Sequence, residues 1–242
     1  MRRVAEETAV ALTYNRVTHA VMMATPADLE DFAVGFSHAE RIIDAPGDIE
    51  EMEAVEAELG IEMRMWIAPE RMAALERRRR HIAGPTGCGL CGMDSLADAM
   101  RTPPKVPPGP VFTAAQIAAA AASLSPAQTL NHVTRAVHAA GFWQGALVTL
   151  REDVGRHNAL DKLTGALLRQ GRDPAAGVLV MTSRISVELV QKAAAAGIGI
   201  LVAVSAPTAL AIRVADAAGI TLVGIARSDG FEVFTHKARI VV

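Results

Sequence analysis

The sequence predicts an α/β protein whose sheet is mixed and mostly parallel, with helices on both faces, preceded by a smaller N-terminal α+β portion. In the second half of the chain, apolar segments of strand length alternate with helical segments, which is typical of strands joined by right-handed crossovers. Gly171, Gly197 and Gly219 stand where three of those helices should end. Prolines crowd 103–110 and exclude a helix or central strand there, so this segment is expected to link 1–102 to 111–242.

The N-terminal portion is expected to contain two pairs of strands and two helices. Thr25 and Pro26 start the first helix as N-cap and first helical residue, and the apolar residues that follow recur at helical spacing. Pro69 starts the second helix, which ends in the four arginines 77–80. The four expected strands are 8–13, 17–23, 49–58 and 61–67.

The second portion is expected to form the larger sheet. Ser125 and Pro126, followed by Gln128, have the pattern of a capping box and predict a helix that ends at Gly141. The other expected helices, two of them rich in alanine, are 114–122, 157–170, 186–196 and 207–218. The expected strands are 144–150, 177–182, 198–204 and 220–226, with a short antiparallel strand at 231–234.

Composition and charge exclude several classes of protein. The chain has 242 residues, of which 51% are hydrophobic and 21% charged, with a formal net charge of −2. It has no basic field to hold nucleic acid or an anionic membrane, and no apolar run reaches membrane-spanning length. The first residues lack an apolar signal region, and two cysteines are too few for a disulfide framework. We therefore expect a cytoplasmic protein without a nucleic-acid or membrane partner.

Both cysteines lie in one glycine-rich segment, 87–92, with the sequence Gly-Cys-Gly-Leu-Cys-Gly. Glycine beside each thiol removes bulk that would shield the sulfur and leaves the backbone free to swing. The spacing of Cys88 and Cys91 therefore favours sulfur chemistry or metal binding over packing as two small buried side chains. Sulfur transfer needs a thiolate that accepts a sulfane sulfur, and a second cysteine nearby can relay it by thiol exchange.

Polar, small and cationic residues follow the predicted strands. In an open α/β sheet, ligands gather at the carboxyl ends of the strands, beside helix N-termini. Ser205 with Pro207 is expected to present unpaired helix amides to a phosphate. Arg156, Arg184 and Arg227 are expected to clamp a second anion, although ordinary capping and solvated loops would leave the same pattern. The segments concerned are 151–158, 182–186, 205–208 and 227–230.

The densest polar cluster is 151–162, and it is expected to be helical from Asn158 onward. His157 and Asp161 are then neighbours at i and i+4 on one face of the helix. Such a pair can act as acid and base or orient a ligand. A salt-bridge cluster at a helix start would give the same sequence pattern, and the two interpretations stay open.

Three segments together resemble the FdhD family, the formate dehydrogenase accessory sulfurtransferases. They are the Gly-Cys-Gly-Leu-Cys-Gly segment 87–92, the block Arg-Glu-Asp-Val-Gly-Arg-His-Asn-Ala-Leu-Asp-Lys at 151–162, and Ser-Ala-Pro-Thr at 205–208. The stretch 22–32 is similar as well, and the resemblance covers nearly the whole chain. One departure is Thr-Ser-Arg at 182–184, where the family pattern has Ser-Gly-Arg.

The resemblance implies a cytidine-deaminase-like α/β core that binds a cofactor, and a homodimer. It implies a sulfurtransferase that passes persulfide sulfur from a cysteine desulfurase to the molybdenum bis(molybdopterin guanine dinucleotide) cofactor before that cofactor enters formate dehydrogenase. Cys88 would carry the persulfide with Cys91 beside it, and the cofactor would be a bound substrate, with no permanent cofactor and no protein-bound metal. The residues expected to bind the cofactor are His157, Asn158, Asp161, Lys162, Arg184, Ser205, Ala206, Pro207, Thr208, Ile225, Ala226, Arg227, Ser228, Asp229 and Gly230.

Two other classes of function stay open. His38 and Glu40, followed later by the two cysteines, formally match the pattern of a zinc-dependent deaminase. Against that match, glycine rather than proline precedes Cys88, and His38 and Glu40 lie two residues apart in a helix, hence on different faces. A non-catalytic chaperone that delivers the cofactor would need the binding site but not the thiols. Substitution of Cys88 and Cys91 therefore separates the chaperone from the sulfurtransferase.

Overall fold

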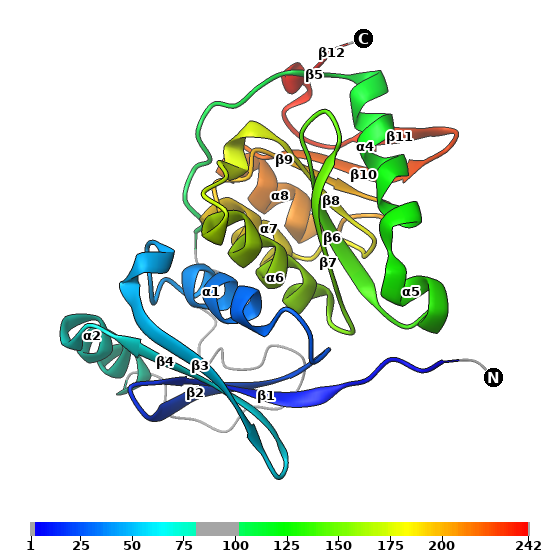
Figure 1. Ribbon diagram of the computed structural model, residues 1–242. Helices are drawn as coiled ribbons and strands as arrows, with labels where there is room; N and C mark the ends of the chain where they lie inside the picture. Colours follow the sequence, from blue (N-terminus) through cyan, green and yellow to red (C-terminus); the bar gives the residue numbers. More distant parts are fainter. Residues whose placement is uncertain (1–2, 81–101, 242) are drawn as a thin grey trace.

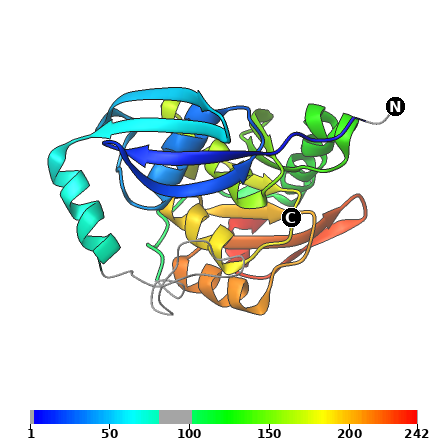
Figure 2. The same cartoon turned by 90° about the horizontal axis from the view of Figure 1, so that it is seen from below.

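The described residues fold around two large β-sheets, with a pair of crossing helices between them, and β5 and β12 form a separate two-stranded sheet (Figure 1). The computed structural model describes residues 3–80 and 102–241, with only the backbone at 78–80. Cys88 and Cys91 therefore lie outside the described residues. Figure 2 shows the N-terminal elements, blue to cyan, on one side of the molecule and the orange and red C-terminal elements on the other.

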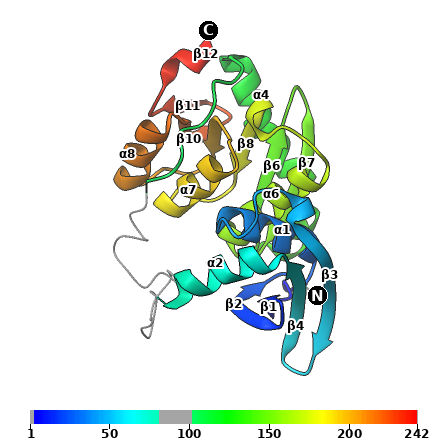
Figure 3. The ribbon, with the colours of Figure 1, turned by 90° about the vertical axis from the view of Figure 1, so that its left-hand side faces the viewer.

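The N-terminal residues form the smaller sheet and the two helices that pack on it. The elements are β1 (Thr8–Tyr14), β2 (Val17–Ala24), α1 (Leu29–Ala39), a 3-10 turn (Pro46–Asp48), β3 (Ile49–Ala57), β4 (Gly60–Ile67) and α2 (Pro69–Arg80). The strand order is β2-β1-β4-β3, with β1 and β4 parallel and the outer pairs antiparallel. Met72 and Leu75 fix α2 to the same apolar core as α1 (Figure 3). The four strands and α2 confirm the sequence predictions.

The C-terminal residues form the larger sheet. The elements are β5 (Phe112–Thr113), α4 (Ala114–Ala127), α5 (Thr129–Thr134), β6 (His138–Trp143), β7 (Leu147–Asp153), α6 (Arg156–Arg169), a 3-10 turn (Pro174–Ala176), β8 (Val178–Met181), α7 (Val187–Ala195), β9 (Ile200–Ala203), α8 (Ala209–Ala218), β10 (Thr221–Arg227), β11 (Gly230–Val233), a 3-10 turn (Lys237–Arg239) and β12 (Ile240–Val241). The six strands run in the order β11-β10-β9-β8-β6-β7.

The α/β class and the mixed sheet are confirmed, and the central strands β10, β9 and β8 are parallel. The antiparallel share is larger than the sequence indicates, because β11, β6 and β7 all run antiparallel to their neighbours. The strand expected at 144–150 is confirmed only from Leu147, where β7 begins, because 144–146 form the turn of the β6–β7 hairpin. Helices α6, α7 and α8 lie where the sequence predicts them.

Helices cover both faces of the larger sheet, as the alternation of side chains along β8 makes clear. Val178 and Val180 pack in a cluster with α4, whereas Leu179 and Met181 pack with α6, α7 and α8. Figure 1 shows α4 on one side of the sheet and the other three helices on the opposite side. Within 3–80 and 102–241, no helix is long and apolar enough to cross a membrane.

The helix expected from near Pro126 to Gly141 is wrong in both bounds, because α4 continues to Ala127 and only the short α5 (Thr129–Thr134) lies within the expected range. Thr113 caps α4 instead, because its Oγ1 accepts a hydrogen bond from the backbone N of Gln116 at 3.2 Å, and Pro126 lies inside α4 near its end. Gly141, expected to end a helix, lies in β6, where a Cβ would come within 2.6 Å of Leu124 Cδ1. The glycine at 141 therefore serves the close packing of α4 on the sheet.

Helix α1 begins later than its sequence predicts. Thr25 and Pro26 precede it in an irregular turn, and the helix begins at Leu29 after Asp28, whose φ is 53°. Thr25 cannot cap α1 because its Oγ1 accepts a hydrogen bond from the backbone N of Val154 at 3.1 Å. A contact with a distant part of the chain thus replaces the expected local cap.

Helices α1 and α6 cross in direct backbone contact, and two glycines allow it. A Cβ at Gly35 would lie 1.8 Å from Asp161 O, and a Cβ at Gly165 would lie 1.9 Å from Asp31 O. Either side chain would force the two backbones apart. Figures 1 and 3 both place α1 against α6, between the two sheets. The crossing therefore fixes the N-terminal portion to the larger sheet.

The proline-rich segment 103–110 contains no helix or strand, as expected, but it is not a free linker. Val106 is buried in the core beneath α7 and α8, and its backbone N donates to Ala218 O at 2.9 Å. This contact fastens the segment to the end of α8. The division of the chain into domains at this segment stays a prediction.

Candidate functional site

The segments that follow β8 and β9 meet the last part of β10 at one edge of the larger sheet. Ile185 N donates to Ala206 O at 3.4 Å, and Ile225 N donates to Ser205 O at 3.2 Å. These bonds bring together segments that the sequence places after successive strands, as the topology predicts. We call this region the strand-end edge, and it consists of Arg184, 205–208 and 225–230.

Three helices begin at the strand-end edge or beside it, and their caps differ. Thr208 caps α8, since its Oγ1 accepts from Ala211 N at 3.2 Å. The expectation that Ser205 with Pro207 presents unpaired helix amides is corrected for this one amide, which Thr208 satisfies. The N-cap residues of α6 and α7, Gly155 and Ser186, make no side-chain cap. The first-turn amides of α6 and α7 are therefore better suited to an anion than those of α8.

The three arginines expected to bind an anion differ in exposure. Arg184 and Arg227 are exposed, and neither has an ion-pair partner in the part of the chain that the structure describes. Arg156 is half-buried at the start of α6, and its Nε has no hydrogen-bond partner among the described residues. Guanidinium groups in such surroundings are available to a phosphate.

The backbone of β10 is strained at the strand-end edge. Ile225 has a φ of 54°, which a β-branched side chain rarely adopts, and it lies in an irregularity of the pairing between Gly224 and Arg227. A Cβ at Gly224 would lie 2.8 Å from Pro207 Cδ, so only glycine lets the 205–208 segment rest on the strand. Strain held by close packing is a feature of ligand sites.

His157 and Asp161 lie on one face of α6, as predicted, but each has its partner on α7. His157 Nε2 lies 2.8 Å from Glu188 Oε2, and Lys192 Nζ lies 2.8 Å from both oxygens of Asp161. The hydrogen bond from His157 lowers the pKa of Glu188. Burial raises the pKa of Asp161, although the Lys192 ammonium opposes this shift.

Sequence reasoning missed Glu188 and Lys192, although a signal was present. These two residues are four apart in the helix predicted at 186–196, so they repeat the spacing of His157 and Asp161. Two adjacent helices with matching i, i+4 pairs of opposite charge can pair along their length. The observed ladder between α6 and α7 is such an arrangement.

A further histidine, His138, belongs to the same region and was also missed. It is the first residue of β6 and pairs in register with Asp153, the last residue of β7. Burial lowers the pKa of His138, and the nearby charges of Arg156 and His157 lower it further. Sequence analysis did not single out His138, because it lay inside the helix wrongly expected to end at Gly141 and not at the end of an expected strand.

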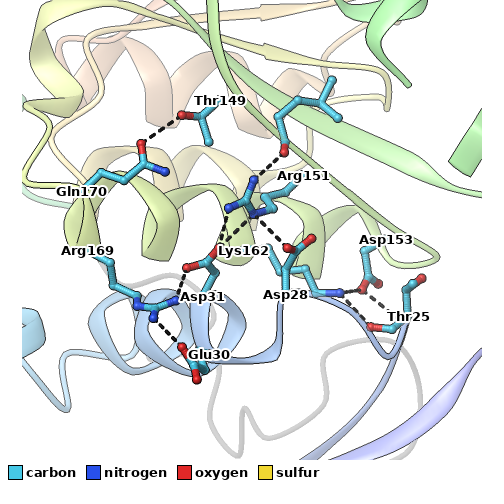
Figure 4. Close-up of polar contacts among 11 residues, drawn as sticks. Thr25, Asp28, Glu30, Asp31, Thr149, Arg151, Asp153, Lys162, Arg169 and Gln170 are labelled. Atoms are coloured by element: carbon cyan, nitrogen blue, oxygen red, sulfur yellow. Dashed lines mark hydrogen bonds and ion pairs between the residues drawn. The ribbon is translucent and has the colours of Figure 1, made fainter. Parts of the chain in front are cut away.

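Two of the predicted binding residues, Asn158 and Lys162, contact the N-terminal portion. Figure 4 shows the contacts of Lys162. Lys162 Nζ lies 2.6 Å from Asp153 Oδ2 and donates to Thr25 O at 2.8 Å, and the side chains of Lys162 and Asp153 are 0% exposed. Asn158 Nδ2 donates to Met23 O at 2.8 Å and to Asp153 Oδ1 at 3.0 Å. Direct binding of a ligand by these two residues stays a prediction; the contacts described here join β2 to α6.

A second polar cluster fastens α1 to the larger sheet beside these contacts (Figure 4). Asp31 accepts hydrogen bonds from two arginines at 2.7 Å each, Arg151 Nη2 on β7 and Arg169 Nη1 at the end of α6. Arg169 also pairs with Glu30. The block 151–162 thus contributes side chains to the N-terminal interface as well as to the contact with α7.

The residues of the zinc-deaminase alternative are only partly described. His38 is half-buried near the end of α1, burial lowers its pKa, and its Nδ1 has no hydrogen-bond partner within the described ranges. The described residues contain no group of three side chains able to hold a metal ion. Cys88 and Cys91 lie outside them, so the alternative is a question for experiment.

Proteins of known sequence or structure are similar to this chain over nearly its whole length, and a solved structure among them has a similar fold. Two sulfur carrier proteins FdhD are similar to the chain. That of Agrobacterium fabrum is 51% identical over 100% of this chain and 90% of its own, and that of Bordetella petrii is 48% identical over 98% and 86%. A crystal structure assigned as a formate dehydrogenase accessory protein from Desulfotalea psychrophila matches with a TM-score of 0.75 at 26% identity, over 98% of this chain and 90% of that one.

A family model decides the classification. The model of the FdhD/NarQ family matches residues 5–241, which include both sheets, the strand-end edge and the two cysteines. The relatives named above agree with this match along the whole chain. The chain belongs to the FdhD/NarQ family.

Proposed function

We propose that the chain is a sulfurtransferase that supplies persulfide sulfur to the molybdenum bis(molybdopterin guanine dinucleotide) cofactor, and that formate dehydrogenase activity depends on it. The proposal is carried by similarity over the whole chain to proteins named as sulfur carriers, in a chain whose only two cysteines share one segment. The similarity to a formate dehydrogenase accessory protein supports formate dehydrogenase as the recipient.

Cys88 is the proposed sulfur acceptor. Its thiolate attacks the sulfane sulfur of a cysteine desulfurase persulfide, so a new S–S bond forms at Cys88 and the desulfurase cysteine leaves as a thiolate. Delivery breaks this S–S bond and regenerates the Cys88 thiolate. The two electrons that reduce the transferred sulfur to sulfide would come from a reduced molybdenum of the substrate cofactor. Cys91 would relay the sulfur before delivery, its thiolate attacking the outer sulfur of the Cys88 persulfide and releasing the Cys88 thiolate.

The strand-end edge is the proposed binding site for the guanine dinucleotide, within a cofactor-binding portion at 111–242. The amides at the starts of α6 and α7 suit a pyrophosphate, and the exposed guanidinium groups of Arg184 and Arg227 suit its charge. His157, bound to Glu188, borders the same region. We further propose a homodimer that meets a cysteine desulfurase and formate dehydrogenase in turn.

Cys88→Ala is expected to abolish sulfur acceptance. The protein is incubated with a cysteine desulfurase and free cysteine, and the added sulfur is mapped by mass spectrometry. Wild type should gain sulfur at Cys88, because a thiolate is needed to attack the donor persulfide. Cys91→Ala, the matched variant, should still gain sulfur at Cys88.

Other outcomes separate the alternatives. A Cys88→Ala variant that gains sulfur at Cys91 and still activates formate dehydrogenase would reverse the roles of the two cysteines. A variant lacking both thiols that keeps full activity would identify a non-catalytic chaperone. One equivalent of zinc in metal analysis of wild type would support the deaminase.

Arg227→Ala is expected to weaken the binding of GDP, used as a probe for the nucleotide end of the cofactor. Losing a charge-assisted contact costs roughly 1.5–3 kcal/mol, which lowers affinity about tenfold to a hundredfold. Titration calorimetry measures the change directly, and Arg184→Ala should behave alike. Arg172, exposed beyond the far end of α6, provides the matched control, and Arg172→Ala should bind GDP like wild type. Unchanged affinity in both test variants would place the nucleotide elsewhere.

A further inference from the structure

Thr25, in the turn between β2 and α1, is held through three of its atoms by the opposite half of the molecule. Its backbone N donates to Asp153 Oδ2 at 3.0 Å, its Oγ1 accepts from Val154 N at 3.1 Å, and its carbonyl accepts from Lys162 Nζ at 2.8 Å. Thr25 is only 6% exposed. Three hydrogen bonds in different directions fix the position of a single residue far more closely than one bond would.

The same carboxylate that holds Thr25 also shapes the start of α6. Asp153 Oδ1 accepts from Gly155 N at 2.7 Å, and Gly155 is the N-cap of the helix that begins with Arg156 and His157. A displacement of Thr25 is therefore transmitted to the first turn of α6. His157 in that turn contacts Ser186 and Glu188 at the start of α7, two and four residues after Arg184 of the strand-end edge.

The other side of Thr25 leads to the N-terminal portion. Thr25 follows β2 directly, and β2 pairs with β1, whose side chains share an apolar core with Met72 and Leu75 of α2. Helix α2 ends at Arg80, eight residues before Cys88 in the sequence. The glycine contacts between α1 and α6 prevent the two halves from moving closer together, and Asp31 fastens α1 to Arg151 and Arg169. Thr25 adds the contact that joins the end of β2 directly to the start of α6.

We propose that Thr25 is a positioning residue that sets the described N-terminal elements, β1 to α2, relative to the strand-end edge. The inference rests on the proposed function, because it assigns Thr25 to the step in which sulfur passes from Cys88 to a cofactor at that edge. Acceptance of sulfur from the desulfurase and binding of the nucleotide each involve one half of the molecule. Delivery of the sulfur requires the two halves to be correctly positioned relative to each other.

Thr25→Val is the test, because valine keeps the shape of threonine and removes the oxygen that accepts from Val154 N. Cys88 is loaded with sulfur-35 from labelled cysteine by a cysteine desulfurase, and transfer of the label to formate dehydrogenase is followed with time. We expect loading and GDP affinity within about twofold of wild type, whereas the delivery rate falls on the order of tenfold to a hundredfold, as for a small misplacement of reacting groups. Thr25→Ser, which restores the hydroxyl, should recover delivery.

Thr235→Val is the matched control. Thr235 is 5% exposed, and its Oγ1 likewise accepts from a backbone N, that of Leu222 at 2.9 Å, but it follows β11 and contacts β10, away from the junction. This variant should lose stability without a selective loss of delivery. Equal delivery by Thr25→Val and wild type, or an equal loss in both threonine variants, would overturn the positioning role alone. Failure of wild type to load sulfur would overturn the proposed function and this inference with it.

Discussion

Gly165→Ala is expected to destabilise the protein by at least about 3 kcal/mol, at the upper end of the range for overpacked cores. Its Cβ would lie 1.9 Å from Asp31 O and 2.8 Å from Gly35 N, both of them backbone atoms that cannot rotate away. Alanine stabilises a helix interior by about 1 kcal/mol relative to glycine, which is too little to offset the clash. Urea unfolding of the purified variant measures the change, and Gly35→Ala should behave alike.

Gly47→Ala is the control for this prediction, because no atom lies within 4 Å of a Cβ at that position. Its unfolding free energy should stay within about 0.5 kcal/mol of wild type, as for ordinary surface substitutions. An unfolding free energy for Gly165→Ala within about 1 kcal/mol of wild type would mean that α1 and α6 cross at a greater distance than described.

Much of the fold follows from local sequence signals, because the C-terminal helices end where local chemistry demands it. Gly171, Gly197 and Gly219 have φ values of 63°, 78° and 78°, the left-handed conformation that only glycine adopts without strain. Each follows a helix whose apolar face packs on the larger sheet. Periodicity and a terminating glycine are properties of a short segment, so they can be recognised without knowledge of the rest of the chain.

The failures occur where a distant contact outweighs a local signal. Thr25 has the sequence of an N-cap, but the carboxylate of Asp153 and the amide of Val154, more than a hundred residues away, take its polar atoms. Gly141 has the sequence of a helix end, but it gives Leu124 room against β6. The residues next to Thr25 and Gly141 do not change with these distant contacts, so local sequence patterns could not predict them.

The candidate site also has features that local sequence signals predict and features that only distant contacts decide. Its backbone segments follow from the order of strands and helices, and the structure brings 205–208 and 225–230 together as topology requires. The direction of each side chain on α6 does not follow from topology. Asn158 and Lys162 face the N-terminal portion, and His157 faces α7, because the two sides of one helix meet different neighbours. Sequence showed that the block is dense in polar residues but not which neighbour each one meets.

Lys162→Met is expected to lower the free energy of unfolding by about 3–5 kcal/mol, the usual cost of removing one partner of a buried ion pair. The Lys162 ammonium and the Asp153 carboxylate, 2.6 Å apart, are both 0% exposed, so methionine fills the space but leaves a buried negative charge. Asp153 keeps the N–H donors of Thr25 and Gly155, which places the loss toward the lower end of that range. Urea unfolding and the melting temperature measure it.

Arg64→Met is the control, because it removes a cation from a pair of similar length that water reaches. Arg64 Nη2 lies 2.8 Å from Glu62 Oε2, with the side chains 40% and 27% exposed, and solvent screens such pairs strongly. Its unfolding curve should match that of wild type. If Lys162→Met unfolded like wild type but lost GDP affinity, Lys162 would bind the nucleotide, and the Asp153 carboxylate would not depend on Lys162 for its charge partner. If it unfolded earlier, with GDP affinity intact in the folded protein, the pair would hold the two halves of the molecule together.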